Sequence, residues 1–164
     1  MKNPIFRTLC ALITLAAATF VSGCAPTSST RSVAAPTKPP SNTAKKVAPI
    51  AWKSSYPTAW EAAYVAKKPL MIDFYADWCQ PCKLMDANTY PDAAVARESS
   101  QFTNVKVNID KEQELAQKYK VNGIPNVIWV DNRGQIIHSA VGYLSPSEMV
   151  REMRIARSKF TPIS

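Results

Sequence analysis

The chain has 164 residues, four cysteines and a formal net charge of +8 at pH 7. The first fifty positions contain six basic residues and no acidic one, whereas residues 51–164 hold 14 basic and 12 acidic side chains. The excess charge therefore belongs to the N-terminal part, and the remainder lacks the basic surface of a nucleic-acid-binding protein. We accordingly expect no nucleic-acid partner.

The chain begins with a basic segment followed by a short apolar stretch. Lys2 and Arg7 lead into an apolar run at positions 8–21. This run is shorter than the roughly 20 residues that a membrane-spanning helix needs. The pattern predicts a signal peptide over residues 1–23.

Cys24 ends a four-residue sequence, Val-Ser-Gly-Cys, that resembles the lipobox of bacterial lipoproteins. The resemblance implies that Cys24 is lipidated and anchors the mature chain to a membrane. An ordinary secretory signal with a chance cysteine at its end is the alternative. Ala25 stands where an aspartate would retain an enteric lipoprotein at the inner membrane. We therefore expect the periplasm-facing side of the outer membrane in the bacterial cell envelope.

Residues 24–50 form a separate segment rich in Pro, Ala, Ser, Thr and Lys. Its five prolines interrupt any helical or strand periodicity, and it has few large apolar side chains to bury. This composition predicts a disordered, partly extended tether between Cys24 and the rest of the chain.

Residues 51–164 are enough for one domain with a single core. Hydrophobic periodicity and turn residues predict helices at 58–66, 79–87, 92–99, 112–119 and 146–159, and strands at 70–75, 105–109, 127–130 and 135–141. Thr58 is the expected N-cap of the first helix, and Ser145 that of the last, with Glu148 three residues later. Strands alternating with helices, then a hairpin and a helix, predict an α/β domain with a mixed sheet and helices on both faces.

The most informative feature of this domain is a pair of cysteines, Cys79 and Cys82, separated by Gln80 and Pro81. The pair follows the apolar strand 70–75 and stands at the predicted start of a helix. A helix start presents unpaired backbone N–H groups and a positive dipole end, which favour a thiolate over a thiol. The spacing also lets the two sulfur atoms meet within one turn, so we expect a dithiol exchange centre.

Two other uses of a Cys-X-X-Cys pair fit less well. A structural zinc site needs a second pair of ligands, and the domain offers only His138. Covalent haem attachment needs a histidine directly after the second cysteine, and Lys83 stands there. We therefore expect no metal and no cofactor.

The stretch from Leu70 to about Met153 resembles thioredoxin throughout. The sequences YADWC at 75–79 and TYPD at 89–92 are similar to the C-terminal thioredoxin-like domain of DsbD and related exported thiol:disulfide interchange proteins. The resemblance implies a thioredoxin fold, with a central mixed β-sheet flanked by helices on both faces. It also implies that the protein is a thiol-disulfide oxidoreductase.

The resemblance assigns roles to four residues. Cys79 would be the attacking nucleophile and Cys82 the resolving thiol, the two forming a redox-active disulfide. Asp73 matches a buried carboxylate that exchanges a proton with the resolving thiol, and Lys106 matches a lysine that tunes it. An acid within an apolar strand supports the first of these matches, because burial favours its protonated form. The alternatives are an aspartate that reaches water from the strand end and a lysine that is simply solvated.

The family's substrate groove is matched by four further residues, namely Trp78, Ile124, Pro125 and Gly142. The family pattern implies a cis bond before Pro125, beside which a substrate chain pairs with the backbone. A trans proline and an ordinary turn glycine are the alternatives. Gln80 and Asn126 replace the glycine and threonine usual in thioredoxin.

Reduction of protein disulfides is the expected direction, because no histidine or basic residue lies between the cysteines. The resemblance implies a monomer that acts on protein disulfides and receives electrons from a DsbD-like inner-membrane donor. A disulfide oxidase or isomerase, and a binding module that holds a partner or Cu(I), are the alternatives.

Overall fold

A computed structural model describes residues 47–162, so the predicted signal peptide, Cys24 and most of the tether lie outside the described residues. In chain order the elements are β1 (Trp52–Lys53), α1 (Tyr56–Ala66), β2 (Leu70–Tyr75), α2 (Gln80–Leu84), the π-helix η1 (Met85–Thr89), α3 (Ala93–Ser99), β3 (Thr103–Asn108), α4 (Gln113–Lys118), β4 (Asn126–Val130), β5 (Ile136–Val141) and α5 (Pro146–Lys159). None of the helices between residues 47 and 162 has the length and apolar character needed to cross a membrane.

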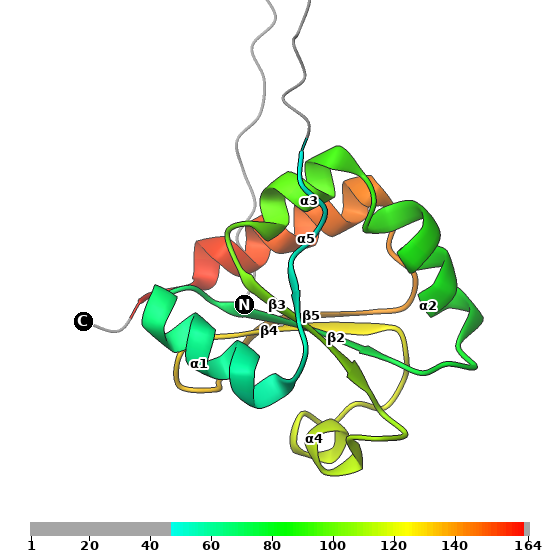
Figure 1. The fold of residues 1–164 in the computed structure, drawn as a ribbon, viewed down its shortest axis with the longest axis horizontal. Coiled ribbons are helices and arrows are strands. Elements are labelled where there is room, and N and C mark those ends of the chain that lie inside the picture. The colour runs from blue at the N-terminus through cyan, green and yellow to red at the C-terminus, as the bar shows by residue number, and fades with distance from the viewer. Residues whose placement is uncertain (1–46, 163–164) are drawn as a thin grey trace, which may run out of the picture. The chain divides into compact units, whose positions relative to one another are not determined.

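The five strands form one sheet in the order β1-β3-β2-β4-β5. Strands β1 and β2 run parallel to β3, whereas β4 is antiparallel to both β2 and β5. Figure 1 shows α2, α3 and α5 over one face of the sheet and α1 and α4 over the other. The predicted mixed sheet with helices on both faces is therefore confirmed.

Alternation along β2 divides its side chains between two apolar cores. Ile72 and Phe74 pack on the face covered by α1 and α4, whereas Met71 packs on the opposite face. That opposite core contains Met85 of η1, Val95 of α3, and Met149 and Met153 of α5. Successive side chains of a strand point to opposite faces. Asp73 therefore lies on the same face as Met71, beneath α2 and η1.

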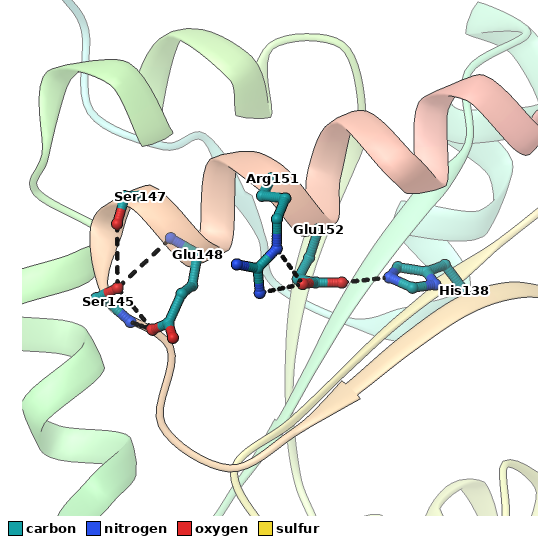
Figure 2. A network of polar contacts seen from close by, with 6 residues as sticks. All are labelled: His138, Ser145, Ser147, Glu148, Arg151 and Glu152. Atoms are coloured by element: carbon teal, nitrogen blue, oxygen red, sulfur yellow. Dashed lines mark hydrogen bonds and ion pairs between the residues drawn. The ribbon is translucent and has the colours of Figure 1, made fainter. Parts of the chain in front are cut away.

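Polar contacts cap helix α5 at its first turn and join it to the sheet near its middle (Figure 2). At the first turn, Ser145 and Glu148 form the reciprocal capping box that the sequence predicts. Farther along, the carboxylate of Glu152 accepts a hydrogen bond from Arg151 and contacts Nε2 of His138 on β5 at 2.6 Å. Strand β5 lies at the edge of the sheet. The contact between Glu152 and His138 therefore joins this edge strand to α5.

The expected N-cap of α1 is wrong. Ser55 caps this helix, and its hydroxyl accepts a hydrogen bond from the backbone N–H of Thr58 at 3.4 Å. Pro57 then lies in the first turn, where no backbone N–H is needed. The helix therefore begins earlier than predicted, because Ser55, three residues before Thr58, takes the capping role.

The helix expected at 79–87 is interrupted by a π-helical turn. Cys79 is the N-cap of α2, which ends at Leu84, and η1 continues directly from it. The backbone N–H of Tyr90 donates to the carbonyl of Met85, five residues earlier, at 3.0 Å. A π-turn contains one residue more than an α-turn, so the phase of every side chain after it changes.

Candidate active site

The two cysteines meet where β2 passes into α2. Cys79 occupies the N-cap position of α2, with Pro81 in the first turn. A disulfide joins Cys79 to Cys82, and Sγ of Cys79 accepts a hydrogen bond from the backbone N–H of Cys82 at 3.2 Å. The same N–H is placed to stabilise a Cys79 thiolate once the disulfide is reduced.

Apolar side chains pack against the disulfide. Both cysteines are buried, and they pack with Ala76 and with the partly buried side chains of Ile109 and Ile124. The hydrogen bond to Sγ of Cys79 comes from the backbone N–H of Cys82, so backbone dipoles at the start of α2 are placed to stabilise a thiolate here.

Trp78 lies immediately before the cysteines and is 64% exposed. Its indole Nε1 donates to Oδ2 of Asp110 at 2.9 Å, and the backbone N–H of Asp110 donates to Oδ1 of Asn108 at the same distance. The loop after β3 therefore orients a large apolar surface beside the disulfide. Such a fixed, exposed aromatic surface suits contact with another polypeptide.

The loop before β4 approaches the cysteines from a distant part of the sequence. The peptide bond between Ile124 and Pro125 is cis. Ile124 packs with the cysteine pair, and the carbonyl of Pro125 accepts a hydrogen bond from the backbone N–H of Gly142 at 2.7 Å. Gly142 has a φ of 96°, a left-handed conformation that favours glycine. The structure thus brings Ile124, Pro125 and Gly142 together, as the family resemblance implies.

Asp73 is 2% exposed, which excludes the alternative of an aspartate that reaches water. Burial raises the pKa of Asp73 to about 6, although the positive charge of Lys106 and the hydroxyl group of Tyr90 act in the opposite direction. The carboxyl group therefore changes its protonation state within the range in which thiol exchange takes place.

Lys106 lies opposite Asp73 in the pairing of β2 with β3. Its Nζ lies 3.5 Å from Oδ2 of Asp73 and also forms an ion pair with Asp86 of η1. Three aromatic rings surround the same ammonium group, at 5.5, 5.0 and 5.2 Å from Nζ to the centroids of Trp52, Tyr75 and Tyr90. Lys106 is thus held between two carboxylates and is not a lysine extended into solvent.

His138, the one histidine considered for a zinc site, lies elsewhere. Its ring contacts Glu152 through Nε2 (Figure 2) and stacks on Trp129 with the centroids 5.5 Å apart. Within residues 47–162, no group of three His, Cys, Asp or Glu side chains is close enough together to hold a metal ion.

Three residues near Asp73 have no site role in the sequence-based predictions, although Tyr90 belongs to the TYPD sequence that carries the family resemblance. Asp86 stands four residues after Cys82, a spacing that places side chains on one face of a helix and so could have identified it. Tyr90 gives no such signal, because the π-turn between it and the cysteines is not visible in the periodicity. Trp52 lies in β1, and a two-residue strand leaves no pattern to detect.

The fold and the site together define a thiol-disulfide exchange centre, with a cysteine pair after strand β2 and a buried carboxylate within that strand. The thioredoxin family model matches residues 52–154, and the chain belongs to the thioredoxin family. The predicted fold and activity class, a thioredoxin fold and a thiol-disulfide oxidoreductase, are confirmed.

Comparisons with individual proteins place the chain near DsbD as well as near thioredoxin. It is 39% identical over 79 residues to the thiol:disulfide interchange protein DsbD of Vibrio vulnificus, covering 46% of this chain and 13% of that protein. It is 33% identical over 89 residues to a Mycoplasma pneumoniae thioredoxin, covering 54% of this chain and 82% of that one.

A solved structure supports the same relationship. The reduced C-terminal domain of Neisseria meningitidis DsbD matches with a TM-score of 0.54 and 25% identity, covering 60% of this chain and 90% of that domain. The expected similarity to the C-terminal domain of DsbD is confirmed. The chain spans only about an eighth of the length of the curated DsbD relative, 13%, so what the whole of DsbD does is not thereby shown for this protein.

Proposed function

We propose that this thiol-disulfide oxidoreductase acts as a reductant of protein disulfides and works from a lipid anchor in the bacterial cell envelope. The observation that carries the direction is the chemical environment of the cysteines. Neither Gln80 nor Pro81 can carry a positive charge, and the apolar side chains of Ala76, Ile109 and Ile124 pack with the disulfide. The similarity to DsbD, a thiol:disulfide interchange protein, supports the same class of substrate.

The reaction begins from the dithiol form. The Cys79 thiolate attacks one sulfur of a target disulfide, forms a mixed disulfide with it and expels the other target sulfur as a thiolate. Cys82 then gives up its proton, attacks Cys79 and releases the second target sulfur. Asp73 is the group proposed to receive that proton, because its pKa of about 6 leaves it largely ionised at neutral pH. Lys106 keeps that carboxylate in place through its ion pair.

The surface beside the disulfide, formed by Trp78 and the loop with Pro125, is proposed to bind the target chain. Trp78 would cover one side of the target, and the backbone beside Pro125 would pair with it as a short added strand. Gly142 leaves this approach open, because no atom outside Gly142 and its two chain neighbours lies within 4 Å of the position that a side chain would occupy there.

Whether the protein reduces or oxidises its targets depends on how strongly its reduced, dithiol form is stabilised. A strong oxidant such as DsbA holds its thiolate so firmly that the dithiol form is favoured. Here the thiolate has the N–H of Cys82 and the start of α2, and no cation between the cysteines. The dithiol is therefore the less favoured form and passes its electrons on.

Equilibration of the purified domain with glutathione redox buffers measures the reduction potential of the Cys79–Cys82 pair. We expect a reduction potential closer to the thioredoxin value of about −270 mV than to the DsbA value of about −120 mV. The reduced protein should also reduce insulin with dithiothreitol as the source of electrons. A potential near the DsbA value would make the protein an oxidase and overturn the proposed direction.

The envelope location rests on the sequence before residue 51. The signal peptide pattern, the lipobox-like residues ending at Cys24 and the Pro-rich segment 24–50 support a lipid-anchored domain on a tether. Ala25 supports sorting to the outer membrane. In that position a DsbD-like protein of the inner membrane is the proposed electron donor.

Replacement of Cys24 by serine tests the anchor. In cells, the unchanged protein should incorporate labelled palmitate and fractionate with the outer membrane, whereas Cys24→Ser should remain unlabelled and leave the membrane fraction. The insulin reduction rate of the two proteins should be equal, because Cys79 and Cys82 are present in both. Equal labelling of both proteins would refute lipidation at Cys24.

A further inference from the structure

Two buried polar atoms beside the exchange centre lack a hydrogen-bond partner among residues 47–162. They are Oδ1 of Asp73 and the hydroxyl oxygen of Tyr90. Both residues are buried, with Tyr90 6% exposed. The hydroxyl is close enough to lower the pKa of Asp73, while burial and the carboxyl group of Asp73 raise the pKa of Tyr90. Both residues also lie against the same ammonium group, since Nζ of Lys106 is 3.5 Å from Oδ2 of Asp73 and 5.2 Å from the ring centroid of Tyr90.

The other groups around Asp73 are already engaged. Its second oxygen, Oδ2, is paired with Lys106 of β3, and Lys106 is in turn paired with Asp86 of η1. On β4 the residue opposite Asp73 is the apolar Val127. Helix α2 contributes Cys82, which titrates only after the disulfide opens, and β1 contributes the uncharged ring of Trp52. Among these groups, Tyr90 is the one whose hydroxyl is available to form a hydrogen bond with Oδ1 of Asp73.

A tyrosine hydroxyl suits a carboxyl group that changes its protonation state. It donates a hydrogen bond to the ionised carboxylate and accepts one from the protonated acid. An ammonium group such as that of Lys106 can only donate, so it serves the ionised form alone. A group that alternately holds and releases a proton needs a partner for both forms, because an unpartnered buried polar atom is costly.

The π-helix η1 determines the position of the Tyr90 hydroxyl. Tyr90 follows η1 directly, and its backbone N–H closes the turn on Met85. Its ring then packs edge-on against Trp52, with the centroids 5.1 Å apart. These ring contacts do not involve the hydroxyl, so phenylalanine at position 90 would remove the hydroxyl and keep the packing.

We propose that Tyr90 is a positioning residue of the exchange reaction, whose hydroxyl hydrogen-bonds Oδ1 of Asp73 in both protonation states and sets the pH range over which Asp73 accepts the proton of Cys82. The inference rests on the proposed function. In the step concerned, the Cys82 proton moves to Asp73 and the Cys82 sulfur bonds to the Cys79 sulfur. The bond from Cys79 to the target sulfur breaks, and the target leaves as a thiolate. Two electrons thus pass from the cysteines to the target.

A titration of Asp73 in the disulfide form tests the hydrogen bond without requiring any catalysis. NMR of carboxyl-labelled aspartate should give a midpoint of about 6 for the unchanged protein. Tyr90→Phe should raise the midpoint by about one pH unit, because a donor to the carboxylate is lost. Tyr119→Phe is the matched control, since it removes a buried hydroxyl that bonds Tyr56 at 2.6 Å on the other face of the sheet. An unchanged midpoint in Tyr90→Phe would overturn the inference.

The pH dependence of the resolving step is the second readout. Reduced protein reacts with a bis-nitrobenzoate disulfide in two phases, the first reporting attack by Cys79 and the second resolution by Cys82. With the Asp73 midpoint raised by one unit, Tyr90→Phe should resolve about fivefold more slowly at pH 6 and at the normal rate at pH 8.5. The attack phase should be unchanged. Equal slowing at every pH would indicate a purely structural role and refute the proposal.

A third measurement covers the case in which Tyr90→Phe does not fold. Fluorotyrosine at position 90 keeps the hydroxyl and makes it a stronger donor, so the Asp73 midpoint should shift downward, opposite to the phenylalanine variant. No shift would count against the proposal. If the unchanged protein carried out neither phase of the exchange, the proposed function would fail, whereas the Asp73 titration would still decide the hydrogen bond.

Discussion

Cys79→Ser is expected to abolish insulin reduction, with the rate falling to that of dithiothreitol alone. A serine hydroxyl cannot form or break a bond to a disulfide sulfur under these conditions, so neither the mixed disulfide nor turnover is possible. The measurement is the turbidity of precipitating insulin, together with non-reducing electrophoresis for covalent adducts. No other cysteine among the described residues could replace Cys79 except its partner, Cys82.

Cys82→Ser is the matched variant for this experiment. It also lacks the disulfide of the unchanged protein, so both variants lose the same cross-link. Cys82→Ser should nevertheless attack and should accumulate a mixed disulfide with its target, because Cys79 remains and the resolving thiol is absent. Full activity in Cys79→Ser, or adducts formed by Cys79→Ser and not by Cys82→Ser, would contradict the assignment of the nucleophile. The adducts trapped in cells would identify the physiological target.

Asp73→Asn is expected to stabilise the protein at pH 7.5 by about 3 kcal/mol while leaving its stability at pH 3.5 almost unchanged. The pKa of Asp73 is about 6 in the folded protein and 3.8 without burial. Between these values the unfolded chain releases its proton while the folded protein retains it. Stability is therefore lost as the pH rises from about 3.8 to 6, and asparagine, which does not ionise, avoids that loss.

Urea unfolding of the disulfide forms at pH 3.5, 5 and 7.5 measures this difference. Lys106 keeps its ion pair with Asp86 in the variant, so no buried cation is left alone. Asp77→Asn, an exposed change close by in the same connection, is the control and should alter stability by less than about 0.5 kcal/mol at each pH. A gain for Asp73→Asn that is the same at all three pH values would contradict the raised pKa.

Local patterns account well for the elements that surround the cysteines. The sequence predicts the strand at 70–75 and the helix at 146–159 with the bounds that the structure shows. The strand is a continuous apolar run, and the helix has a complete capping box, so each carries its own signal. The wrong N-cap at Thr58 shows the limit of such signals, because two hydroxyl residues three positions apart both satisfy the rule for a cap.

Elements that depend on distant partners are missed. Strand β1 has two residues and exists because it pairs with β3, about fifty positions later. The π-helix η1 has only five residues, which is too short for its longer repeat to be distinguished from that of an α-helix in the sequence. Its consequence is large, since it brings Tyr90 to Asp73. The family resemblance, not a local pattern, led to the expectation that Ile124 and Pro125 lie beside the cysteines.

The amino-acid sequence by itself determines which atoms of this protein react, namely the sulfur atoms of Cys79 and Cys82. Two thiols three positions apart, at a helix start after an apolar strand, predict thiol-disulfide exchange from local sequence alone. The protonation of Asp73 has a different origin. Its carboxyl group shares Lys106 with Asp86 and faces Tyr90 because β2, β3 and η1 come together in the folded domain. Burial and electrostatic interactions depend on neighbours in space, and here those neighbours come from separate segments of the chain.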